Sequence, residues 1–162
     1  MTYKAIQTAG MVFILVSVIL SSNTAAAGND RNMGDWGIDD PYNKFYDVKE
    51  FEQIRAWVKR IKTVTPLPGM SLGVALDVYE GSQEFEVQIA PVWFMKPEEL
   101  GIKPGDRIKI KGVWAEINGK DVFLASKIKK GDHWEFKVRL TKNGKPFWTM
   151  TQQELATETD RE

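Results

Sequence analysis

The chain of 162 residues contains no cysteine and a single histidine, His133. Without cysteine it cannot form a disulfide, a thiol nucleophile, a cysteine metal site or a cysteine-linked lipid anchor. A single histidine argues against a histidine-rich metal centre and against a conventional histidine-based catalytic triad. We therefore expect a protein that is not an enzyme and that holds no metal ion and no cofactor.

Net charge is also lacking, because 22 basic and 22 acidic side chains balance, but these charges are unevenly placed. Residues 28–54 carry seven acidic and three basic side chains, whereas residues 55–152 carry seventeen basic and eleven acidic ones. The pattern indicates a mildly basic domain behind an acidic N-terminal segment. Such a domain favours anionic partners, although an ordinary mixed surface would give the same counts.

Long apolar runs are absent apart from residues 11–20, which follow Lys4. This run is too short to span a bilayer, which takes about 20 residues. The small residues Ala25 and Ala27 then form a signal-peptidase cleavage pattern. We predict that residues 1–27 are a signal peptide cleaved after Ala27, that the protein is exported to the periplasm, and that no stable membrane span remains. A retained anchor is the alternative.

Residues 83–114 show the clearest β pattern in the chain. Apolar and polar side chains alternate from Phe85 to Ile89, and this period of two predicts a strand with one buried face. Residues 96–101 have an early proline, acidic residues in the first turn and a final glycine, which predict one helical turn. A tight turn then leads into a second alternating strand, in which Gly112 predicts a bend or a bulge.

The remaining segments of the domain, residues 47–150, continue this pattern. Alternation predicts further strands at residues 72–79, 121–128 and 134–140, and the Asn-Gly pair at 118–119 predicts a hairpin. The spacing of the apolar residues between positions 47 and 64 fits a helix and a strand equally well. We choose a strand from Arg55 to Val64, because β-branched residues gather there.

Together these elements predict an all-β domain. Five principal strands, a short helical insert between the third and fourth, and a C-terminal hairpin follow the order of an OB-fold barrel. We therefore predict a five-stranded OB-like barrel, with an open sandwich as the alternative. A mobile acidic and aromatic arm at residues 28–46 and a polar tail at residues 151–162 are expected to flank it.

Several short motifs between residues 46 and 148 resemble a group of small exported bacterial proteins with an OB-fold-like domain. The motifs are Tyr46-Asp47, Gly69-Met70, VQIAPVWF at 87–94, KPGDRI at 103–108, Gly112, Leu124-Ala125, Lys130-Gly131 and GKPFW at 144–148. Some similar domains occur among magnetosome-associated proteins, and the plan is distantly similar to that of bacterial OB-fold stress proteins of the periplasm. The chain departs from the group at Ala90, where glycine is usual, and after Arg139, where an acidic partner is usual.

A basic strand face is the first candidate site. Outward positions on neighbouring predicted strands carry Lys109, Lys111, Lys127, Lys129, Lys137 and Arg139, with Trp114 and Trp134 as candidates for stacking. OB-folds bind single-stranded nucleic acid with such aromatic platforms in a basic groove. The alternative is a soluble basic sheet whose tryptophans lie in the core.

The N-terminal arm is the second candidate site. Its aromatic residues Trp36, Tyr42, Phe45 and Tyr46 are too apolar for a plain linker. They either pack on the chain's own domain or contact a partner, which we expect to be another envelope or periplasmic protein. The sequence thus predicts a non-enzymatic periplasmic binding or assembly module, accessory to an envelope or metal- or redox-related complex. The alternative is a binder of oligonucleotides or other polyanions through the basic strand face.

Overall fold

The computed structural model describes residues 32–159, so the predicted signal peptide at residues 1–27 lies outside the described part of the chain. The strands are β1 (Phe51–Val64), β2 (Gly73–Glu80), β3 (Gln83–Pro91), β4 (Arg107–Ile117), β5 (Lys120–Lys130) and β6 (Trp134–Lys137). Four short 3-10 helices are η1 (Pro41–Phe45), η2 (Val48–Glu50), η3 (Pro97–Leu100) and η4 (Phe147–Thr149), and the α-helix is α1 (Gln152–Thr159). None of the helices in residues 32–159 is long and apolar enough to cross a membrane.

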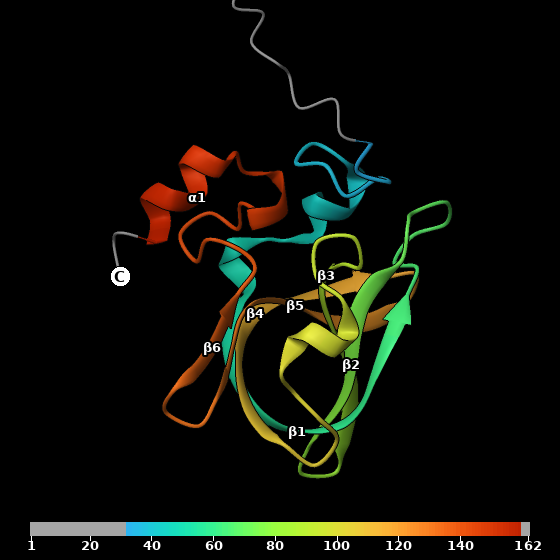
Figure 1. The fold of residues 1–162 in the computed structure, drawn as a ribbon. Coiled ribbons are helices and arrows are strands. Elements are labelled where there is room, and N and C mark those ends of the chain that lie inside the picture. The colour runs from blue at the N-terminus through green and yellow to red at the C-terminus, as the bar shows by residue number, and fades with distance from the viewer. Residues whose placement is uncertain (1–31, 160–162) are drawn as a thin grey trace, which may run out of the picture. The chain divides into compact units, whose positions relative to one another are not determined.

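The strands form one sheet that closes on itself. Neighbouring strands pair antiparallel in the order β3-β2-β1-β4-β5-β6, and β3 also pairs parallel with β5. Five strands therefore make a closed ring of pairings around the core, with β6 attached to the far end of β5 (Figure 1). The predicted all-β class is confirmed, and the helical insert between the third and fourth strands is η3, which ends at Gly101 in the left-handed conformation.

The segment with ambiguous period, residues 47–64, contains the long strand β1. Ile54, Ala56 and Val58 are buried at alternating positions, so they face the inside of the ring. The register then shifts between Val58 and Arg60, which is a bulge. The next residue to pack on the core is Ile61, three positions after Val58. This bulge explains the helix-like spacing, because one extra residue in a strand turns a period of two into a step of three.

A second bulge lies at Gly112, as the sequence predicted. The register between β4 and β5 shifts between Lys111 and Gly112, which leaves Ser126 as the extra residue on β5. A β-carbon at Gly112 would lie 2.1 Å from the carbonyl oxygen of Leu124. Only glycine therefore allows the two backbones to approach so closely at this point.

The N-terminal segment, residues 32–46, packs on the domain and does not extend from it as a mobile arm. Trp36, Tyr42 and Tyr46 are buried, and Phe45 is partly buried against the same core. The indole N–H of Trp148 donates to the carbonyl oxygen of Trp36 at 2.8 Å, and the two rings meet edge to face. Of the two arrangements that the sequence left open, these side chains therefore adopt packing on their own domain, and they are not exposed as the partner contact would require.

The C-terminal region differs from its prediction in two ways. The expected hairpin is reduced to a single bridge between Arg139 and Pro146, followed by η4. The expected polar tail instead begins with α1. The hydroxyl of Thr151 accepts from the backbone N–H of Glu154, and the carboxylate of Glu154 accepts from the backbone N–H of Thr151. This reciprocal cap stabilises the helix start despite its polar composition.

Replacing Gly112 with alanine is expected to lower the free energy of unfolding by about 3 kcal/mol, because the new methyl group meets the backbone of β5. Urea denaturation measures the change. Gly81→Ala is the matched control: its φ of 59° is positive, but nothing lies within 4 Å of the added carbon. That control is expected to lose only about 1 kcal/mol through backbone strain. Equal losses in both variants would contradict the close approach at Gly112.

Candidate functional site

The outer wall of the ring carries a cluster of cations whose positions follow from strand register. Residues at alternate positions in β1, β4 and β5 point outward, because their neighbours fill the core. Register places Arg55 opposite Lys109 and Lys109 opposite Lys129, and the next row joins Lys111, Lys127 and Lys137. We call this surface the basic face; it consists of Arg55, Arg107, Lys109, Lys111, Lys127, Lys129 and Lys137.

One carboxylate is placed within the basic face. Glu135 on β6 forms ion pairs with Lys127 at 2.6 Å and with Lys129 at 2.9 Å. Burial alone would raise the pKa of Glu135, but the hydrogen bonds from these two lysines outweigh burial and lower the pKa. Burial, together with the neighbouring Lys127, lowers the pKa of Lys137. The β5–β6 edge of the basic face is thus partly neutralised.

The centre of the basic face is different. Within residues 32–159, no carboxylate forms an ion pair with Arg55, Arg107, Lys109 or Lys111. Like charges on neighbouring strands repel each other, so this arrangement costs stability unless an anion binds there.

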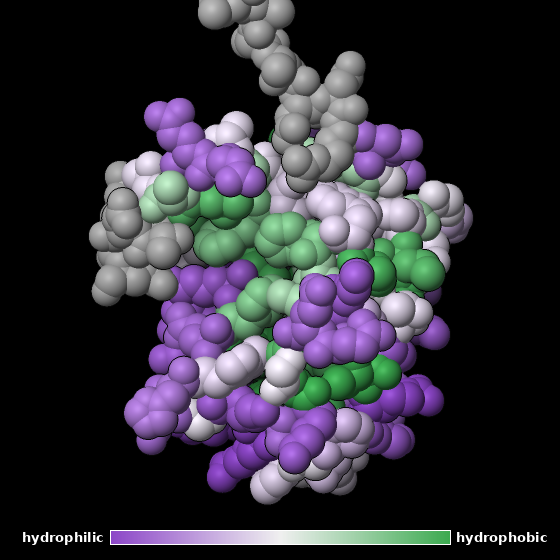
Figure 2. Space-filling model, in the orientation of Figure 1, coloured by the Kyte–Doolittle hydropathy of each residue, from purple (hydrophilic) through white to green (hydrophobic). Residues whose placement is uncertain are grey.

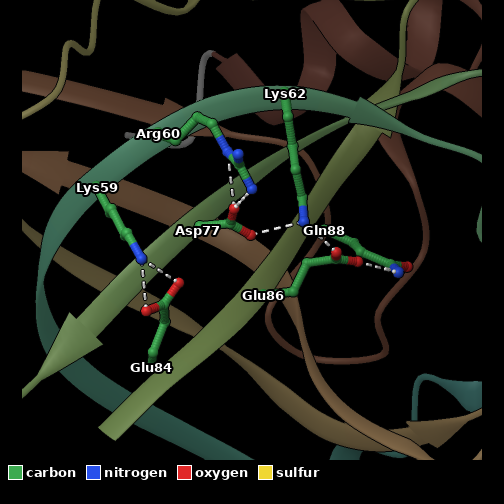
Figure 3. Close-up of polar contacts among 7 residues, drawn as sticks. All are labelled: Lys59, Arg60, Lys62, Asp77, Glu84, Glu86 and Gln88. Carbon is green, nitrogen blue, oxygen red and sulfur yellow. Dashed lines mark hydrogen bonds and ion pairs between the residues drawn. The ribbon is translucent and has the colours of Figure 1, made fainter. Parts of the chain in front are cut away.

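The other half of the outer wall, over β1, β2 and β3, carries cations that are already neutralised. Figure 3 shows Lys59 paired with Glu84 at 2.7 Å, and Arg60 and Lys62 both paired with Asp77. Lys62 also contacts Glu86 at 2.7 Å. The cations of this half are therefore held in a network of carboxylates, and the positive charge of the sheet is left on the β1–β4–β5 side.

Asp77 is the centre of that network and is only 6% exposed. Burial alone would raise its pKa, but hydrogen bonds and charges from Lys62 and Arg60 outweigh burial and hold the pKa of Asp77 below its ordinary value of 3.8. The network continues inward, since Gln88 donates to Glu86 at 2.8 Å and accepts from the hydroxyl of Tyr42 at 2.9 Å. Burial raises the pKa of Tyr42, so this hydroxyl keeps its proton.

Two adjoining grooves cross the basic face. One, of about 430 Å³, is lined by the side chains of Arg55, Arg107, Lys109, Lys129 and Asp132, among others. The second, of about 400 Å³, is lined by Gln53, Arg55, Trp57, Glu80, Gly81 and Arg107. Arg55 and Arg107 line both. In the view of Figure 2, hydrophilic side chains cover most of the lower part of the molecule, and apolar side chains reach the surface only in patches between them.

Trp57 and Tyr79 lie beside the cations and were missed by the sequence analysis. Register pairs these two residues across β1 and β2, and their side chains are 42% and 39% exposed. The guanidinium of Arg107 lies 5.8 Å from the ring centroid of Trp57. Arg55 and Arg107 were also missed. Alternation could have found Arg55 and Trp57, because both are out of phase with Ile54, Ala56 and Val58 in the same strand.

Arg139 was predicted on the basic face, and this prediction is wrong. Its side chain is only 2% exposed, with its guanidinium carbon 4.8 Å from the ring centroids of both Tyr46 and Trp148. The cause lies in the backbone, because the N–H groups of Val138 and Arg139 both donate to the carbonyl oxygen of Ser126. Two residues share one partner, so the alternation of β6 is lost and Arg139 turns inward.

The two predicted stacking residues do not face the basic face either. Trp114 follows Ile108 and Ile110 at even spacing, so it faces inward, where its ring meets Phe123 and its N–H donates to Glu52 at 2.7 Å. Trp134 and Glu135 are neighbours in β6, so they lie on opposite faces of the strand. The ring of Trp134 packs on Phe136, and the ammonium group of Lys130 lies over it. Both tryptophans are therefore part of the core and its rim.

His133 lies at an exposed position in the turn between β5 and β6. Among residues 32–159, no group of three or more His, Asp or Glu side chains is placed to hold a metal ion.

The described residues define a small all-β domain with a one-sided cationic outer wall. The chain belongs to the MamS/MamX magnetosome protein family, whose family model matches residues 50–134. This match spans β1 to β5 and so includes six of the seven cations of the basic face, as well as Trp57. It agrees with the resemblance to magnetosome-associated proteins. No curated protein matches the chain significantly.

Replacing Asp77 with asparagine is expected to lower the free energy of unfolding at pH 7 by about 2 kcal/mol, because two charged hydrogen-bond donors lose their carboxylate. The folded-state pKa of Asp77 lies below the unfolded value. Its contribution is therefore present above pH 3.8 and is lost as the pH falls through the folded-state pKa.

In denaturant titrations, the difference between wild type and Asp77→Asn should accordingly begin to narrow as the pH falls below 3.8 and should close below the folded-state pKa. The exposed Asp121 is the control, and its asparagine variant is expected to stay within about 0.5 kcal/mol of wild type at every pH. A difference for Asp77→Asn that persists unchanged into acid would show that the ion pairs contribute nothing.

Proposed function

We propose that this protein is a non-enzymatic binding module that holds an anionic partner on its basic face. The observation that carries the proposal is the set of four cations, Arg55, Arg107, Lys109 and Lys111, for which residues 32–159 offer no ion-pair partner. On the same sheet, Lys59, Arg60 and Lys62 are each matched by a carboxylate. Unmatched cations beside matched ones are the pattern expected where a ligand supplies the missing charge.

A role as an accessory in a larger assembly of the cell envelope, metal- or redox-related, fits this surface. Membership of a magnetosome protein family supports such a role. The contact would run through the basic face, because the aromatic side chains of residues 32–46 are buried or partly buried in the domain. A polyanion is the second candidate ligand, and the same cations favour it.

The strand order supports a further proposal about the fold, namely an OB-like barrel. The ring β1-β2-β3-β5-β4 has a parallel β3–β5 pair and a helical turn between β3 and β4. A five-stranded barrel with Greek-key connections has this plan.

Neutralising Lys109 and Lys111 to glutamine should weaken binding of the full-chain protein to labelled inorganic polyphosphate. Affinity should fall as salt rises, since binding releases counterions, and the slope of log K against log salt should decrease by about 0.7 for each contact removed. Fluorescence anisotropy over a salt series measures both quantities. The matched control is the pair Lys59→Gln and Lys62→Gln, whose cations are already neutralised. No binding, or the same slope change in both pairs, would refute the proposal.

We also propose export, on the sequence of residues 1–27 alone. In a bacterium with a periplasm, the mature protein should begin at Gly28, and it should leave with the periplasmic fraction on osmotic shock. Mass spectrometry of the intact protein detects the loss of 27 residues. A chain that keeps its N-terminus and sediments with membranes would establish a retained anchor instead.

A further inference from the structure

The two grooves on the basic face have two lining residues in common, and we call the pair of grooves the track. Arg55 and Arg107 line both of them, so a ligand that contacts these arginines reaches Trp57 on one side and Lys129 on the other. Each groove lies within the size range of small-molecule sites, about 300–1,000 Å³. The track therefore suits a short chain of several units better than a single inorganic ion.

Exposed rings lie at one end of this track. Trp57 lines the groove itself, and Tyr79 stands directly opposite it on β2. Both rings are more than one third exposed, although aromatic side chains of this size are mostly buried when they serve only the core. Arg107 lies against Trp57 and keeps the edge of this platform positive. A ligand with flat or apolar faces between its charges fits this arrangement.

Acceptors also line the track. Gln53 and Glu80 line the groove beside Trp57, and Asp132 lines the other groove. Carboxylates repel phosphates but accept hydrogen bonds from hydroxyl groups. The backbone of a DNA strand has no free hydroxyl group, so it offers Glu80 and Asp132 no donor in return for the repulsion of its phosphates. A chain of rings that carries both hydroxyl and carboxylate groups is complementary to the cations, to the hydrogen-bond acceptors and to the aromatic ring that line the track.

We propose that this track binds a short acidic oligosaccharide, with its carboxylates on Arg55, Arg107 and Lys109 and a sugar ring against Trp57. Its hydroxyl groups donate to Glu80 and Asp132. This inference rests on the proposed function, because it names the class of anion that the basic face takes.

Isothermal titration of the full-chain protein with hexagalacturonate tests the platform. Trp57→Ala should weaken binding about fivefold to tenfold, since one ring contact is lost. The same variant should leave polyphosphate binding within about twofold, because that ligand has no rings. Trp93→Ala is the matched control: Trp93 is 39% exposed but lies outside the basic face, and its loss should change neither affinity. Circular dichroism confirms that each variant is folded.

A second variant tests the acceptors by its effect on the relative affinities of two anionic ligands. Glu80→Gln combined with Asp132→Asn removes two negative charges, so polyphosphate and oligo(dT) should bind more tightly. Hexagalacturonate should gain less than these two ligands, so its affinity relative to that of oligo(dT) should fall about threefold or more, because its hydroxyl groups lose charged acceptors. Wild type should also prefer hexagalacturonate to oligo(dT) of equal charge. An unchanged ratio of the two affinities in the double variant, or a preference of the wild type for oligo(dT), would overturn the assignment.

The outcomes separate this inference from the proposed function. If polyphosphate binds with the expected salt dependence but hexagalacturonate does not bind, or binds equally well without Trp57, the oligosaccharide assignment is wrong and the basic face still binds anions. If neither ligand binds, both proposals fail.

Discussion

The parallel pairing of β3 with β5 is the constraint on which the rest of the structure depends. It joins the two edges of the β3-β2-β1-β4-β5 sheet and so leaves the ring with one inside and one outside. Apolar side chains such as Val87, Ile110 and Phe123 then fill the inside and are almost completely buried. The alternate positions must lie on the outer wall, which carries both the basic face and the ion pairs around Asp77.

That surface has two halves, one on either side of β1, and they differ in which charged residues face each other. Toward β2 and β3, carboxylates oppose the cations, and Asp77 is held between Arg60 and Lys62. Toward β4 and β5, cations oppose cations, because Arg55, Lys109 and Lys129 share one row. Repulsion between like charges is modest at an exposed surface, so the fold tolerates the second arrangement. Positive charge is therefore concentrated on one side of the sheet, although the net charge of the whole chain is zero.

The chain ends on either side of the sheet hold each other in place. Residues 32–46 and η4 share a small core in which Trp36 meets Trp148 and Arg139 lies among Tyr42, Tyr46 and Trp148. The guanidinium donates to the carbonyl oxygen of Gly144 at 3.1 Å. Aromatic faces attract a cation most strongly where water is excluded, so these rings offset part of the cost of burying Arg139. The segments are thereby fixed against the domain without a disulfide.

The sequence by itself determined the all-β class, the helical turn at η3, the bulge at Gly112 and the outward lysines of β4 and β5, because period and turn residues are local properties. Only the tertiary structure decided which strands are neighbours, and hence that Arg55 and Trp57 join the lysines while Lys59 and Lys62 are neutralised. It also decided the burial of Arg139, whereas alternation within β4 and β6 already places Trp114 and Trp134 away from the basic face. Bulges at Lys59 and after Lys137 shift the phase of the strands, and a one-residue shift moves a side chain from one face to the other. Such shifts depend on the partner strand, which no local pattern contains.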